Sequence, residues 1–280
     1  MLSLLQYSFF QNALVACLLA GIVCGLVGTY IVSRRMVFVA GGMAHSSLGG
    51  VGICALLGWS PTLGATVFAL LTGWGVQRLS RHREVRSDSA IAMLWALGMS
   101  VGIICSYLSP EFLPNLSSYL FGNILLIDSA DMWLLGALAT VVMAVFLLCM
   151  PQIITIAFDR DFAQAQRQPV RLMEWLMMTL VALSIVAALK VAGIVLVISL
   201  LSVPQMTANL FCRCMHTMAL WSVVIACVGC LGGLIASTWL NVPCGAMVVV
   251  VLIVIYLLCR TIKSLFESFY YNNKVKTKQT

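Results

Sequence analysis

Long apolar runs constrain this chain more than any other feature of its sequence. They recur along its whole length, and each reaches the roughly 20 residues that a helix needs to cross the hydrocarbon core of a bilayer. Of the 280 residues, 62% are hydrophobic and only 9% are charged, whereas an ordinary soluble domain carries about 25% charged residues. Such a chain cannot cover itself with polar surface, so we expect it to fold in lipid.

The runs predict helices and not the strands of a barrel. In lipid every backbone polar group must be satisfied within the protein, which leaves helices or closed barrels, and the runs lack the alternation of apolar and polar residues that barrel strands show. We therefore expect an all-α, polytopic transmembrane bundle over residues 1–265, followed by a basic cytoplasmic tail over 266–280. The predicted spans number nine, or eight if a broken helix lies near Lys190: 9–33, 36–58, 61–79, 89–109, 131–150, 172–190, 192–211, 216–239 and 244–262.

The positions of Lys and Arg predict the orientation. They cluster in 34–35, 78–86, 160–171, at Arg213 and in the tail, whereas the loops at 59–61, 110–130 and 240–243 contain none. Because basic residues stay on the cytoplasmic side, the N-terminus is expected outside and the C-terminus inside. The net charge of +7 then reflects topology and attraction to anionic membrane lipid, and no basic stripe with interleaved aromatics indicates nucleic-acid binding.

The sequence contains no signature of catalysis. It has no phosphate-binding loop of the form G-x-x-x-x-G-K-[ST], so any ATP must be bound by another chain. Most of the eleven cysteines stand singly inside apolar runs, which favours small buried hydrophobes over disulfides or a zinc site. We expect no enzyme activity and no resident cofactor.

His45 is the most informative polar residue inside a predicted span. An ionisable group at that depth faces a cavity or a partner, and imidazole is a common ligand of transition metals. The alternative is a neutral histidine bonded to a backbone carbonyl. Neighbouring glycines, at 41, 42, 49, 50 and 52, indicate either a narrow conduit or close helix packing.

Four segments resemble the permeases of ABC-type zinc, manganese and iron importers. They are Ser33–Phe38 leading into Ala44-His45-Ser46, Ile91–Gly102, Tyr119–Leu125 with the run YLFGNIL, and Val191–Ala208. Each motif is weak alone, but their order and spacing agree over about 9–262. The resemblance implies a permease subunit that carries a divalent metal ion across a bacterial cytoplasmic (inner) membrane. Its expected partners are an ATP-binding cassette ATPase, an extracytoplasmic metal-binding protein and a second copy of this chain.

The resemblance also assigns a role to the segment 158–165. A similar stretch in the family is a short helix that docks into the ATPase subunit. The residues agree in part, because Asp159 and Asp161 stand near a helix start, where carboxylates favour the helix dipole. Phe158, Phe162 and Ala163 offer an apolar docking face. An ordinary solvated loop is the alternative.

Gly41 departs from the family pattern. Metal-selective members tend to carry Asp four residues before the histidine, which places a carboxylate and an imidazole on one helix face. Without that carboxylate the site is based on His45, which favours zinc over manganese or iron. A second copy of the chain would supply further ligands. Gln205 and Asn209 are further candidates for lining the path, with helix–helix hydrogen bonding as their alternative.

The expected mechanism is alternating access, in which the ATPase moves the spans through the 158–165 segment. A secondary transporter is disfavoured because the spans lack the inward-facing charge pairs that would couple an ion. A structural or signalling subunit would have no ATPase partner. Residues 117–127 are expected to form a re-entrant or outward-facing segment, and Lys190 to reach the membrane interface.

Overall fold

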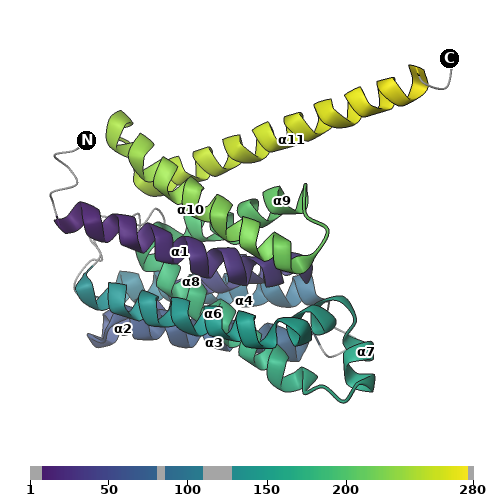
Figure 1. Ribbon diagram of the computed structural model, residues 1–280. Helices are drawn as coiled ribbons and strands as arrows, with labels where there is room; N and C mark the ends of the chain where they lie inside the picture. The colour runs from purple at the N-terminus through teal and green to yellow at the C-terminus, as the bar shows by residue number, and fades with distance from the viewer. Residues whose placement is uncertain (1–7, 81–85, 110–127, 277–280) are drawn as a thin grey trace.

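Every regular element in the described part of the chain is a helix. The computed structural model describes residues 8–80, 86–109 and 128–276, and it confirms the all-α prediction. Long helices lie alongside one another in a bundle, and the short helix α7 lies at one end of it (Figure 1). The helices are α1 (Ser8–Ser33), α2 (Val37–Leu57), α3 (Pro61–Leu79), α4 (Ser87–Leu108), α6 (Ser129–Phe158), α7 (Arg160–Ala165), α8 (Val170–Leu200), α9 (Val203–Asn209), α10 (Met215–Leu240) and α11 (Cys244–Lys276).

Seven of the described helices are long and apolar enough to cross a membrane, which is fewer than the nine predicted spans. The two segments that make the difference are 61–79 and 192–211. The first is helix α3, which with 19 residues is long enough to span but is not apolar enough. The second contains a break, because the chain leaves helical geometry at Gly193 (φ 70°, ψ 168°) and α8 ends at Leu200 before α9 begins. The broken helix expected near Lys190 therefore lies three residues further on.

The central helices carry most of the buried surface. The apolar stretches of α1, α2 and the first part of α8 are largely buried, whereas those of α4, α6 and α11 are largely exposed. In a membrane such exposed apolar faces contact lipid or another subunit. Helix α11 runs without interruption past residue 265 to Lys276 and extends beyond the bundle (Figure 1), and Lys263 donates to the Leu210 carbonyl at 2.7 Å.

Residues predicted to be cytoplasmic lie together at one end of the bundle. Arg34, Arg35 and Arg160 line the same cavity there. That cavity is also lined by the last turn of α3. Asp131 and Lys190 line a different cavity with the first turn of α3, so they lie at the opposite end of the bundle. The side of the membrane that each end faces stays a prediction.

Small residues let α2 approach α3 and α4 closely. A Cβ added to Gly50 would overlap the Gly64 backbone, and Gly49 lies in the same way against the Gly98 carbonyl. The buried hydroxyls of Ser46 and Thr72 are 2.7 Å apart and join α2 to α3. Close helix packing therefore accounts for Gly49 and Gly50, as small residues commonly permit in membrane bundles.

Candidate metal path and coupling segment

His45 lies on the face of α2 that packs against α4. His45 follows Gly42 by three residues and precedes Gly49 by four, so all three lie on one side of the helix. Gly42 and Gly49 pack against Ile91 and Gly98 of α4. The imidazole stacks on the Trp95 ring, with ring centroids 4.4 Å apart and planes inclined by 13°. The Trp95 indole N–H donates to the Met99 sulfur at 2.9 Å, which orients the ring beside the histidine.

The imidazole has an unsatisfied nitrogen. His45 is half-buried, and its Nδ1 is a buried atom that has no hydrogen-bond partner among the described residues. A buried polar atom without a partner costs free energy unless something else binds it. The backbone-bonded alternative is therefore not seen at Nδ1 among the described residues.

Gly41 is not required by helix packing. A Cβ added there would meet only Ile198 Cδ1, at the ordinary contact distance of 3.8 Å, whereas one added to Gly42 would come within 2.7 Å of Ile91 Cγ2. Position 41 thus has room for the beginning of a side chain. Among the described residues, no group of three or more His, Cys, Asp or Glu side chains is placed to hold a metal ion.

Gln205 and Asn209 are held differently from His45. Gln205 is fully buried, and its amide donates to the carbonyls of Cys24 at 2.9 Å and Leu200 at 3.2 Å. It therefore ties α9 to α1 and to the end of α8, which is the geometry of helix–helix hydrogen bonding. Asn209 is exposed at the end of α9. The structure does not bring either residue into a described contact with His45.

The 158–165 segment contains a capped helix. The Asp159 carboxylate accepts a hydrogen bond from the Phe162 N–H at 2.9 Å, which satisfies one of the free donors at the start of α7, and Asp161 lies in its first turn. Phe158 and Phe162 are 72% and 53% exposed, whereas Ala163 is fully buried. The predicted helix start is confirmed. The exposed apolar surface of the segment comes from the two phenylalanines, and the placement of Ala163 on that surface was wrong because its side chain packs inward.

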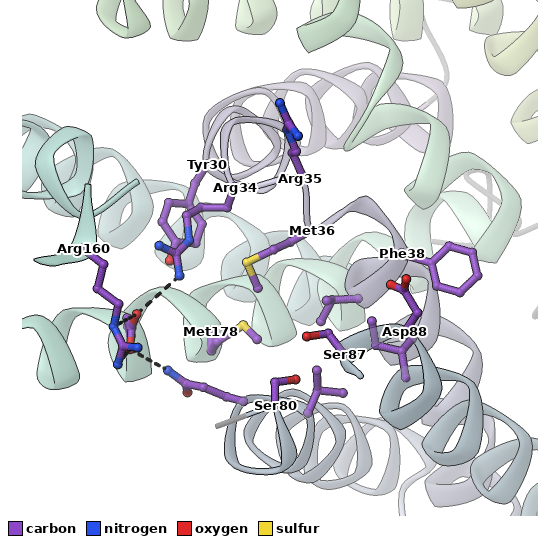
Figure 2. A pocket seen from close by; sticks show the side chains of 15 residues that line it. Tyr30, Arg34, Arg35, Met36, Phe38, Ser80, Ser87, Asp88, Arg160 and Met178 are labelled. Carbon is purple, nitrogen blue, oxygen red and sulfur yellow. Dashed lines mark hydrogen bonds and ion pairs between the residues drawn. The ribbon is translucent and has the colours of Figure 1, made fainter. Parts of the chain in front are cut away.

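A buried carboxylate that the sequence analysis missed lies next to this segment. Glu174 is 5% exposed and binds Arg160 at 3.2 Å, Arg34 at 3.3 Å and the Gln77 amide at 3.4 Å. A cavity of about 330 Å³ lies beside the cluster, and Figure 2 shows Arg34 and Arg160 converging on one carboxylate. The signal in the sequence was an acidic residue inside a predicted span, which requires a partner.

Lys190 forms an ion pair, and its position at the membrane interface stays a prediction. Its ammonium donates to Asp131 at 2.6 Å and thereby joins α8, just before the break at Gly193, to the first turn of α6. The predicted segment 117–127 lies outside the described residues.

Comparisons with known proteins agree with the motifs. The model of the ABC 3 transport family matches residues 6–263. The manganese transport system membrane protein MntC of Halalkalibacterium halodurans is 32% identical over 248 residues, which cover 89% of this chain and 85% of the relative. An uncharacterised membrane protein of Synechocystis sp. is 34% identical over 258 residues, or 92% of each chain. The solved structure of PsaBC from Streptococcus pneumoniae in complex with Fab has a TM-score of 0.82 at 28% identity and covers 91% of this chain and 92% of its own.

The helical fold and these matches define a multi-pass membrane protein of a transport system. The chain belongs to the ABC 3 transport family. The resemblance to metal permeases that its motifs indicate is confirmed, and its role is that of a transport permease and not of an enzyme.

Proposed function

We propose that this chain is the membrane permease of an ATP-driven importer of divalent transition-metal ions, with His45 on the path of the ion. The observation that carries the proposal is the buried Nδ1 atom of His45, which has no hydrogen-bond partner among the described residues, in a chain that belongs to a transport family. Sparse ligation suits a path, because an ion must leave as readily as it enters. The ATPase, an extracytoplasmic metal-binding protein and a second copy of the chain complete the assembly in the bacterial cytoplasmic membrane, with the N-terminus outside.

Manganese is the ion that we expect to be carried. The zinc preference predicted from the sequence rests on imidazole chemistry alone. MntC of Halalkalibacterium halodurans, to which the chain is similar, is a manganese transport system membrane protein, and this similarity does not support zinc. A second copy would bring a second His45, so that two chains share the coordination that one does not provide.

Uptake by reconstituted vesicles tests the function. Vesicles would contain this chain with its co-purifying ATPase, supplied with the binding protein and with Mn²⁺, Zn²⁺ or Fe²⁺ in turn. We expect accumulation that requires ATP and is greatest for Mn²⁺. Accumulation driven by a proton or sodium gradient without ATP would instead identify a secondary transporter, and no accumulation of any of the three ions would contradict the proposal.

The free space at Gly41 gives a second prediction. Gly41→Asp adds a carboxylate one helical turn from His45, and a hard anionic ligand favours Mn²⁺. We expect the variant to bind Mn²⁺ roughly tenfold more tightly, because changes in the residues around a metal site alter metal affinity by about that factor. Equilibrium binding of Mn²⁺ to the purified complex measures the change. Gly41→Asn is the matched control, since it fills the same space without charge, and equal affinity in both variants would contradict the prediction.

A further inference from the structure

The carboxylate of Glu174 joins three helix ends at the end of the bundle that carries α7. Glu174 stands in the second turn of α8, and its partners are Arg34 from the end of α1, Gln77 from the end of α3 and Arg160 from the start of α7. The Arg160 guanidinium contacts both carboxylate oxygens, at 3.2 Å through Nε and at 3.3 Å through Nη2. These contacts lie together in Figure 2.

The carboxylate at the centre of this cluster is buried, whereas its two guanidinium partners are partly exposed. The Glu174 side chain is only 6% exposed, and a buried carboxylate is tolerated only while its charge is compensated. Removing one guanidinium would leave the carboxylate with a single cationic partner, whereas neutralising the carboxylate would leave two guanidinium groups without their shared anion. The carboxylate and its two guanidinium partners are therefore expected to move together.

Arg160 connects the cluster to α7. It is the first residue of a helix of six residues, of which Ala163 is the one buried position. The ion pair with Glu174 is thus the main polar tie between α7 and the bundle among the described contacts. A force on the exposed phenylalanines of this segment would reach Glu174 through Arg160.

Arg34 connects the same cluster to the helix that carries His45. Its guanidinium also donates to the Ile156 carbonyl at 2.8 Å, so it contacts the last turn of α6 as well. It lies three residues before α2 begins, and the next residue, Arg35, adopts a left-handed conformation (φ 56°) that makes the turn tight. A displacement of Arg34 therefore reaches the start of α2 through a short, constrained connection.

The neighbouring cavity offers the cluster a second arrangement. The side-chain atoms Gln77 Oε1 and Ser80 Oγ are buried and lack hydrogen-bond partners within the described ranges, and both residues line the cavity. A guanidinium that moved into this space would find acceptors there. Two packed arrangements of one element are what a switching step requires.

We propose that Glu174 is a positioning residue that transmits movement of α7 to the α1–α2 turn, so that the ATPase and the metal path change state together. This inference rests on the proposed function, because it requires an ATPase at α7 and an ion that passes His45. It differs from a purely stabilising role in one measurable quantity, the number of ATP molecules hydrolysed per ion taken up.

The test compares three variants in the reconstituted complex. Arg160→Met breaks the tie to α7 and leaves the Arg34–Glu174 pair in place, Glu174→Gln removes the shared anion, and Arg160→Lys restores the charge. We expect assembly and ATP hydrolysis to persist in the first two variants while the ratio of ATP hydrolysed to Mn²⁺ taken up rises about tenfold, within the usual range of coupling effects. Arg160→Lys should return the ratio toward the native value.

Asp131→Asn is the matched control, because it neutralises one carboxylate of an ion pair at the opposite end of the bundle and should leave the ratio unchanged. The inference is overturned if Arg160→Met lowers uptake and ATP hydrolysis only as far as it lowers the amount of assembled complex. It is also overturned if the ratio of ATP hydrolysed to Mn²⁺ taken up does not change. Arg160→Met decides alone if Glu174→Gln does not fold. A native complex that hydrolyses ATP but takes up no ion would refute the proposed function itself, and the coupling role with it.

Discussion

Gly50→Ala should force α2 and α3 apart locally and destabilise the fold, although it adds a single methyl group. The added Cβ would overlap the carbonyl group of Gly64, and the backbone nitrogen of Ala65 would be only 3.0 Å away. These are backbone atoms, so they cannot swing aside as the end of a flexible side chain would. We expect a loss of about 3 kcal/mol of folding free energy, the upper part of the range for overpacked cores. Thermal unfolding of the purified protein in detergent would measure it.

Gly136→Ala is the matched control for this substitution. It adds the same methyl group to α6, where the nearest atom, Leu19 Cδ1, is 4.0 Å from the new Cβ. Because alanine is favoured over glycine inside a helix by roughly 0.5–1 kcal/mol, this variant should be at least as stable as the native chain. Equal stability of the Gly50 and Gly136 variants would show that α2 and α3 do not meet as closely as the structure indicates.

The fold was largely predictable because its cause is local. The length of an apolar run predicts a spanning helix without knowledge of its neighbours. The carboxylate of Asp159 is likewise a local signal for the start of α7. The helix breaks were harder to place, since Gly193 and the residues before α9 interrupt a run whose hydrophobicity is continuous. Hydrophobicity marks a membrane segment, but backbone geometry decides whether the segment is one helix.

The candidate site was predictable only in part, because its contacts are long-range. His45 stood out as a lone ionisable residue in a span, but its stacking on Trp95 joins two helices whose pairing no local pattern gives. Glu174 shows the limit most clearly, because Arg34 is 140 residues away from it in sequence and Gln77 is 97 residues away. The role of glycine was also ambiguous until the structure separated Gly50, which backbone contact requires, from Gly41, which nothing crowds.

His45→Phe should abolish most of the ion uptake while leaving the protein assembled. Phenylalanine keeps an aromatic ring that can stack on Trp95, so the packing of α2 against α4 is preserved, but it has no nitrogen to coordinate a metal. Loss of a residue that only holds a metal ligand in place lowers metal affinity or activity about 10- to 100-fold. Loss of the ligand itself should lower Mn²⁺ uptake by at least as much. The measurement is ATP-dependent uptake per assembled complex in vesicles, with assembly checked by co-purification of the ATPase.

Trp95→Phe separates coordination from packing. It removes the indole N–H that contacts Met99 but keeps a ring beside the imidazole, so uptake should stay within a small factor of native. If uptake falls in both variants alike, the stacked pair matters for packing and not for the ion. If His45→Phe transports as the native chain does, the histidine is structural and the path must be sought at Gln205 and Asn209. Selective loss in His45→Phe alone would place the ion at His45, because the two variants share their packing and differ in the nitrogen at position 45.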